Sequence, residues 1–154
     1  MKKYILLVLV GILTTVFYGC DSETKDVALL QKVVAVPTEP SAVEKIVKSN
    51  SYIDIDINDV AKQLATGTRA ANTNDLAMTK AAVYRFYSHV RLNADHQYEC
   101  TLTSAKDINV SQNVFDVLSK NLDDMNKFIK ESAKSGQSVE VPEITEDYLS
   151  SLLK

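Results

Sequence analysis

Two cysteines and two histidines are the residues of this sequence best suited to chemistry. A cysteine attacks a substrate only as a thiolate with a base beside it. Cys100 stands between Tyr98 and Leu102 in an alternating apolar pattern, and His89 falls on the opposite face of that pattern. We therefore predict a buried, unreactive thiol at Cys100. Because His89 and His96 lack further ligands at suitable spacing, we predict no metal site.

The acidic string from Asp54 to Asp59 is a second candidate, because it begins like a calcium-binding loop. An EF-hand loop requires glycine at its sixth position and glutamate at its twelfth. Counted from Asp54, these positions hold Asp59 and Ala65, so the match fails. The string alternates instead, which predicts a strand with one buried face. The buried face would carry Ile53, Ile55 and Ile57, and the solvated face Asp54 and Asp56.

The other cysteine, Cys20, ends an apolar stretch near the N-terminus. Residues 1–3 are basic and residues 4–17 are mainly apolar, the order found in a secretory signal. This stretch is too short to span ~30 Å of hydrocarbon, which needs roughly 20 apolar residues. The run Phe17-Tyr18-Gly19-Cys20 resembles the lipobox of bacterial lipoproteins, in the looser form of Bacteroidota-type envelope lipoproteins. Gly19 and Cys20 match the box, whereas Phe17 and Tyr18 are bulkier than its commonest residues. The alternative is an ordinary signal peptide with a chance cysteine.

This resemblance implies that residues 1–19 are a signal peptide and that Cys20 is lipidated. Two or more acyl chains, such as palmitate, hold a protein stably to a membrane, whereas one chain anchors it only marginally. The location would be the cell envelope, on either the periplasmic face or the cell surface of the outer membrane. The stretch 21–26 is only mildly acidic, so both locations stay open.

The charge of the chain excludes two classes of partner. Removal of residues 1–19 takes away two lysines and no acidic residue, so the formal charge moves from −3 to −5. Such a chain has no electrostatic footprint for nucleic acid and does not bind anionic lipid by charge.

No motif of a known catalytic type occurs in the sequence. A glycine-rich phosphate loop, a Gly-x-Ser-x-Gly elbow and a His-Glu-x-x-His pair are all absent. We expect a non-enzymatic, membrane-tethered protein that binds another protein or serves as an accessory module, without a cofactor. The alternative is a small envelope hydrolase, which a cleft with convergent titratable groups of shifted pKa would indicate.

Behind the signal, the pattern predicts one small domain. Residues 20–40 would form the tether and a first element, in which 27–36 fits either a strand or a helix. Residues 41–154 would form a single α+β domain. Pro40 begins a predicted short helix that ends near Asn50, and residues 60–65 form a helical turn that Asn58 or Asp59 would cap.

An antiparallel hairpin is predicted over about 83–103. Its inner faces would carry Tyr84, Phe86, Val90 and Leu92 on one strand and Tyr98, Cys100 and Leu102 on the other. For both sets to face one core, paired residue numbers must sum to an even value, so the connection is either 93–95 or 93–97. The alternative is a helix from 75 through 90, but the density of aromatic and β-branched residues favours the strand.

The longest predicted helix covers about 111–134, with Ser111 as N-cap and Gly136 as its stop. Its apolar stripe consists of Val114, Leu118, Leu122, Met125 and Ile129. Thr145 would cap a last helix. Together these elements predict a small two-layer α+β domain in which the hairpin packs on the long helix.

The candidate partner-binding face is the outer face of the predicted hairpin: Arg85, Tyr87, His89 and Arg91. Arginine and tyrosine are enriched at contact hot spots, and two guanidinium groups would favour a protein partner with an acidic surface. A solvated sheet face with a cross-strand charge pair is the alternative.

Overall fold

The computed structural model describes residues 30, 32–66, 72–136 and 141–154. The predicted signal peptide, the lipobox and Cys20 lie outside these residues. The described chain is mostly helical with one antiparallel hairpin, so the prediction of a small α+β domain is confirmed. Its elements are α3 (Pro40–Ser49), α4 (Ile57–Thr66), α5 (Thr73–Tyr87), β1 (Val90–Leu92), β2 (Tyr98–Cys100), η1 (Ala105–Ile108), α6 (Gln112–Lys134) and α7 (Glu146–Leu152).

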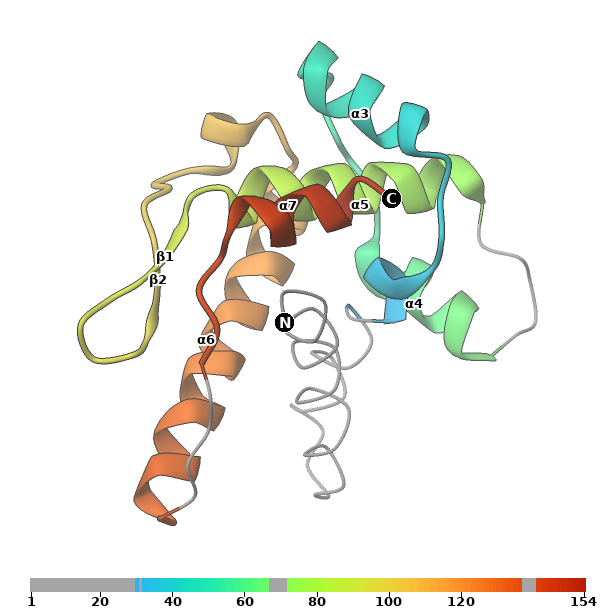
Figure 1. The fold of residues 1–154 in the computed structure, drawn as a ribbon. Helices are drawn as coiled ribbons and strands as arrows, with labels where there is room; N and C mark the ends of the chain where they lie inside the picture. The colour runs from blue at the N-terminus through green and yellow to red at the C-terminus, as the bar shows by residue number, and fades with distance from the viewer. Residues whose placement is uncertain (1–29, 31, 67–71, 137–140) are drawn as a thin grey trace.

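Helix α5 is the central element of the fold. It contacts α3, α4, α6, α7 and η1, and Figure 1 shows it crossing the middle of the molecule with α3 on one side and α4 on the other. The Asn72 side chain caps its first turn by accepting a hydrogen bond from the backbone N–H of Asn74 at 3.0 Å. Because other elements surround α5, it buries side chains around most of its circumference rather than along one stripe.

The first part of the predicted hairpin is wrong, because residues 83–87 belong to α5 and not to a strand. The alternative prediction, a helix from 75 through 90, is closer to the observed structure of this segment, although the helix ends at Tyr87. Val83, Arg85, Phe86 and Tyr87 are all buried, a pattern that alternation cannot produce. The aromatic residues that favoured a strand are accommodated on the helix by the elements packed around it, since tertiary packing overrides a weak β-propensity.

A shorter hairpin follows directly, and its predicted register is correct. β1 pairs with β2 antiparallel through Val90↔Cys100, Arg91↔Glu99 and Leu92↔Tyr98, so the paired numbers sum to an even value. The connection is the longer of the two predicted options, 93–97, closed by a hydrogen bond from the Asn93 N–H to the Gln97 carbonyl at 2.9 Å. Within this connection His96 has a left-handed backbone conformation, with φ 55°, which helps to reverse the chain between the two strands.

The hairpin is held on α6 by one side chain. The Asn126 amide accepts a hydrogen bond from the Tyr98 N–H at 2.7 Å and donates one to the Tyr98 carbonyl at 2.8 Å. An amide side chain thus replaces the next strand of the sheet at this residue. The two groups of Tyr98 that point away from β1 are thereby satisfied.

The predicted strand at 51–59 is reduced to one parallel bridge between Ile53 and Val110. Ile53 and Ile57 are buried and Asp54 and Asp56 are exposed, as alternation predicts, but α4 already begins at Ile57. Asp56, and neither Asn58 nor Asp59, caps this helix by accepting a hydrogen bond from the Asp59 N–H at 3.0 Å. The capping geometry ends the extended segment earlier than the isoleucine pattern indicates.

The remaining helices agree with their predicted ends. α3 ends at a left-handed Asn50, and α6 is capped by Ser111 and followed by Gly136 at φ +75°. Thr145 caps α7. In the ambiguous segment 27–36, the described residues 32–35 are helical.

A single substitution tests the attachment of the hairpin. Asn126→Leu should remove both partners of the Tyr98 backbone and lower the free energy of unfolding by about 1–3 kcal/mol, because buried polar groups would lose their hydrogen bonds. Urea denaturation measures this loss, and Asn113→Leu on the exposed side of the same helix serves as control with a change within about 0.5 kcal/mol. Equal stability of the two variants would contradict the role assigned to Asn126.

Candidate functional site

The four residues predicted to form one partner-binding face do not share a surface. Arg85 and Tyr87 lie in α5 and are 6% and 4% exposed, whereas His89 and Arg91 lie beyond the helix and are exposed. The prediction of a continuous strand face is therefore wrong. The cause is the helical conformation of 83–87, which turns Arg85 and Tyr87 into the interior.

Arg85 binds backbone carbonyls from three separate segments. Its Nη2 donates to the Ile46 carbonyl at 2.6 Å, and its Nη1 donates to the carbonyls of Ser51 at 2.9 Å and Ile108 at 3.2 Å. Ile46 belongs to the last turn of α3, where the helix dipole favours a cation, and its carbonyl also accepts from the Ser49 hydroxyl at 3.2 Å. Arg85 therefore joins α3, the segment after it and η1 to the central helix.

This buried guanidinium has no carboxylate partner among its hydrogen bonds. Burial lowers the pKa of Arg85, although a guanidinium stays protonated in proteins. Its Nε is buried and makes no hydrogen bond. Three carbonyl dipoles thus compensate the charge. The side chain is used inside the fold and is not accessible to a partner protein.

Tyr87 also joins elements of the fold. Its hydroxyl donates to Asn121 Oδ1 on α6 at 2.9 Å, and its ring packs edge-on against Phe86 and Tyr148 with centroids 5.5 Å and 6.4 Å away. Burial raises the pKa of Tyr87 well above its ordinary value and raises that of Tyr148 to about 12. This aromatic cluster connects α5 with α6 and α7.

Cys100 is half-buried on β2, and desolvation raises the pKa of its thiol. A hydrogen bond from the Leu102 backbone acts in the opposite direction but is the smaller effect. A raised pKa keeps the sulfur protonated and therefore a weak nucleophile.

Sequence reasoning missed Lys80, which is 2% exposed in the middle of α5. Its Nζ donates to the Lys154 carbonyl at 3.1 Å, and the Thr38 N–H donates to the same oxygen at 3.3 Å. Desolvation lowers the pKa of Lys80. Its position within an alanine-rich run, 77–82, was the signal, because small neighbours allow other elements to approach and cover a lysine.

A pocket of about 40 Å³ lies between the start of the described chain, α4 and α6. It is lined by Leu30, Ile57, Asn58, Ala61, Val117, Lys120, Asn121 and Asp124. Pockets that hold small molecules are of the order of 300–1,000 Å³. Lys80, Arg85 and Cys100 are not among the lining residues, so the buried titratable groups do not converge on this pocket.

The exposed side chain that stands out is Tyr52, in the segment between α3 and α4. It is 60% exposed, the only large hydrophobic side chain so exposed in the described part of the chain. Its sequence context, between Ser51 and a buried isoleucine, gave no sign of this because tyrosine is common on both faces of strands.

No family model, curated protein or solved structure matches this chain. Within residues 30, 32–66, 72–136 and 141–154, no three His, Cys, Asp or Glu side chains gather as they would around a metal ion. None of the helices described is both long enough and apolar enough to cross a bilayer.

The role of Arg85 predicts a strong effect on stability. Arg85→Met should leave the carbonyls of Ser51 and Ile108 without their donor and take one of two side-chain donors from the Ile46 carbonyl. The free energy of unfolding should fall by about 3 kcal/mol or more. Arg85→Lys, which keeps the charge but not the two-nitrogen fork, should recover only part of this loss. The exposed Arg91→Met is the matched control. If urea denaturation gives equal values for Arg85→Met and Arg91→Met, the structural role is refuted.

The buried phenols predict an alkaline loss of stability. The folded pKa of Tyr148, about 12, exceeds the ordinary value of about 10, so the folded state retains a proton that the unfolded state has lost. The corresponding stability is complete below pH ~10 and disappears as the pH rises toward ~12. Tyr148→Phe should therefore show a shallower fall of unfolding free energy over this window than the parent chain. If the unfolding free energies of the two chains fall equally steeply with pH, a raised pKa of Tyr148 is ruled out.

Proposed function

We propose that this protein is a membrane-tethered lipoprotein of the cell envelope that acts as a non-enzymatic protein-binding or accessory module. The proposed anchor is Cys20, whose lipobox lies outside the described residues. The domain behind it would work by being held at the membrane, on the periplasmic face or the cell surface of the outer membrane. Tethering raises the effective concentration of a binding module at that surface without any new contact.

One observation favours a binding module over the alternative of a hydrolase. The interior titratable groups are each used to join elements of the fold: Arg85 binds three carbonyls, Tyr87 binds Asn121, and Lys80 binds the Lys154 carbonyl. An acid–base site needs such groups to converge on a cleft where a substrate can reach them. Here they are dispersed along α5 and covered by other elements.

The carboxylate of Asp107 is exposed and has a lowered pKa, and it too stabilises the fold. Asp107 Oδ2 accepts hydrogen bonds from the Thr103 N–H at 3.0 Å, from the Thr103 hydroxyl at 3.1 Å and from the Ser104 N–H at 2.9 Å. These bonds lower the pKa of Asp107 and complete the capping box of η1. Its charge therefore stabilises a turn.

The anchor is tested by substitution of the proposed lipidation site. Cys20→Ala should abolish labelling with a radioactive or alkyne fatty acid, leave the signal uncleaved by the lipoprotein peptidase and change the mass accordingly. Cys100→Ala is the matched control, since it removes the other cysteine and should retain label and processing. Recovery of Cys20→Ala in the membrane, trimmed normally after residue 19, would refute the proposal.

A further inference from the structure

The extended segment between α3 and α4 is hydrogen-bonded along one of its two edges. Ile53 forms the parallel bridge to Val110, donating one backbone hydrogen bond at 3.1 Å and accepting another at 2.8 Å. The Ser51 carbonyl is bound from the same side, because Arg85 Nη1 donates both to it and to the Ile108 carbonyl. The bonded edge of this segment therefore faces η1 and the residues that follow it.

The opposite edge of the segment is open. Successive residues of an extended chain direct their backbone groups to alternate sides, so the N–H and C=O of Tyr52 and Asp54 point away from the bridge. No residue in the described part of the chain forms a hydrogen bond with any of these four groups. Tyr52 is 60% exposed and Asp54 is exposed too, so both residues lie at the surface. An unpaired edge of this kind is a template on which another extended chain can pair.

The open edge has a fixed shape because both ends of the segment are held. Before it, Asn50 ends α3 with φ 48°, and its carbonyl accepts from the Asn109 side-chain amide at 2.5 Å. After it, Asp56 accepts from the Asp59 N–H at 3.0 Å and begins α4. Little backbone entropy is therefore left to lose when a partner pairs with this segment.

The side chains on the outward face of the segment are one aromatic ring and two carboxylates. Ile53 and Ile57 are buried, and alternation places Tyr52, Asp54 and Asp56 on the other face, where all three are exposed. Neither carboxylate forms an ion pair with a residue that the structure describes. Their charges are therefore available to a cation beside the open edge.

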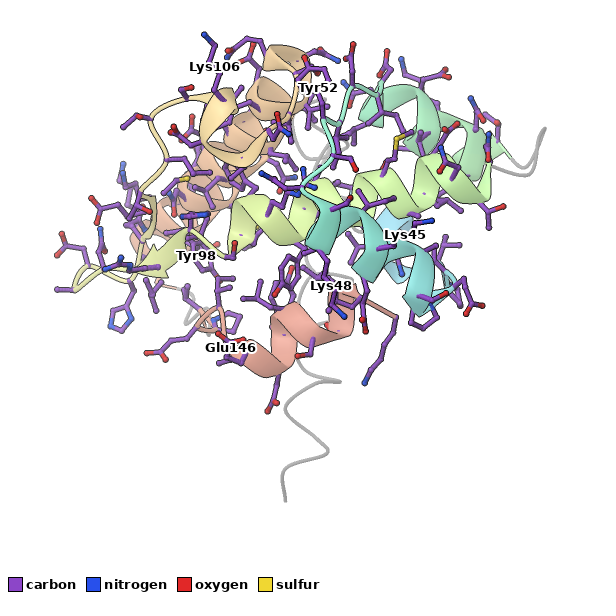
Figure 2. All side chains as sticks on the ribbon, turned by 90° about the horizontal axis from the view of Figure 1, so that it is seen from above. Lys45, Lys48, Tyr52, Tyr98, Lys106 and Glu146 are labelled. Atoms are coloured by element: carbon purple, nitrogen blue, oxygen red, sulfur yellow. The ribbon has the colours of Figure 1, made fainter. Side chains whose placement is uncertain are left out.

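The neighbouring η1 contributes one charge of each sign. Asp107 has a lowered pKa and stays ionised, and Lys106 is exposed. Figure 2 shows Tyr52 on the same side of the molecule as Lys106, whereas Lys45 and Lys48 lie on α3, apart from it. The exposed charged groups of the segment and η1 are thus three carboxylates and one ammonium group, an arrangement that complements a basic partner.

We propose that the open edge at Tyr52 and Asp54 receives an extended segment of a basic protein as an added strand. Main-chain hydrogen bonds to the four free groups would supply affinity, and the outward side chains would supply specificity. An aromatic or β-branched side chain of the partner would lie opposite Tyr52, and the next residue on the same face, a Lys or Arg, opposite Asp54. This inference rests on the proposed function, because it names the surface and the partner chemistry of the tethered module.

The charges around the edge disfavour other occupants. A second copy of the chain, paired edge to edge, would bring Asp54 and Asp56 of both copies together, and like charges on neighbouring strands are destabilising. Anionic lipid would be repelled by the same carboxylates. The acidic partner expected from the sequence depended on Arg85 and Tyr87, which are buried.

Site-specific photocrosslinking of the full chain in its own cells tests the edge. A photoreactive benzoylphenylalanine replaces Tyr52 in one strain, and Arg91 or Lys130, both exposed on other elements, in the control strains. We expect a discrete protein adduct from position 52. The crosslinked peptide of the partner should carry Lys or Arg close to the attachment point.

Two kinds of variant separate the charge of the edge from its backbone pairing. Asp54→Asn with Asp56→Asn removes both charges but keeps a side-chain cap for α4, and it should reduce the adduct about tenfold. The matched pair Asp95→Asn with Asp123→Asn removes the same charge from exposed positions elsewhere and should leave the adduct unchanged. Asp54→Pro also removes the N–H of the open edge, so it should abolish the adduct. Its melting temperature should stay close to that of the parent chain, because proline is tolerated where a strand N–H faces solvent.

Several results would overturn this inference. These are a lipid adduct, an adduct of twice the mass of the chain, an acidic crosslinked peptide, and equal adducts from the two asparagine pairs. An undiminished adduct from a folded Asp54→Pro chain would do the same, and if that variant does not fold, the asparagine pairs decide. Adducts at 91 or 130 without one at 52 would overturn the edge and leave the binding function standing. Absence of adducts at all three positions, with fatty-acid labelling of Cys20 intact, would overturn the edge and count against the binding function itself.

Discussion

The rest of this structure depends on the burial of one arginine. Arg85 brings a positive charge into the interior without a carboxylate, and three backbone carbonyls compensate it. Since these carbonyls come from α3, the segment after it and η1, the charge can be satisfied only when all three have docked on α5. Two of these bonds, to the carbonyls of Ser51 and Ile108, lie on either side of the bridge between Ile53 and Val110. A desolvated charge is costly when a partner is missing, so the arrangement of this half of the molecule is strongly specified.

The same residue types carry opposite meanings on a helix and on a strand. On an exposed strand, Arg85 and Tyr87 would be contact residues for a partner. On a helix surrounded by other elements, the guanidinium and the phenol become internal connectors, and each is satisfied by a group on a neighbouring element. Tyr52, by contrast, stays exposed because no other element in the described part of the chain covers it.

A tethered module, as proposed for this protein, would separate attachment from recognition. The proposed lipid anchor would supply location, while a rigid surface would supply specificity. The interior of the domain contributes rigidity: Asn126 replaces a missing strand beside Tyr98, and the aromatic cluster around Tyr87 joins α5 to α6 and α7. Side chains that would be reactive in a solvated cleft are protonated or hydrogen-bonded here, as the raised pKa of the Cys100 thiol illustrates.

The sequence by itself determined the features that depend on neighbouring residues. Pro40 and Asn50 bound α3, Ser111 and Gly136 bound α6, and the parity of the hairpin register followed from alternation. These depend on φ preferences and local hydrogen bonds, which act over a few residues. Only the tertiary structure decided whether 83–87 was helix or strand, because both patterns fit and the surrounding elements settled which side chains are buried. For the same reason the exposure of Tyr52 could not be predicted, since it depends on where Arg85 holds a segment more than thirty residues away.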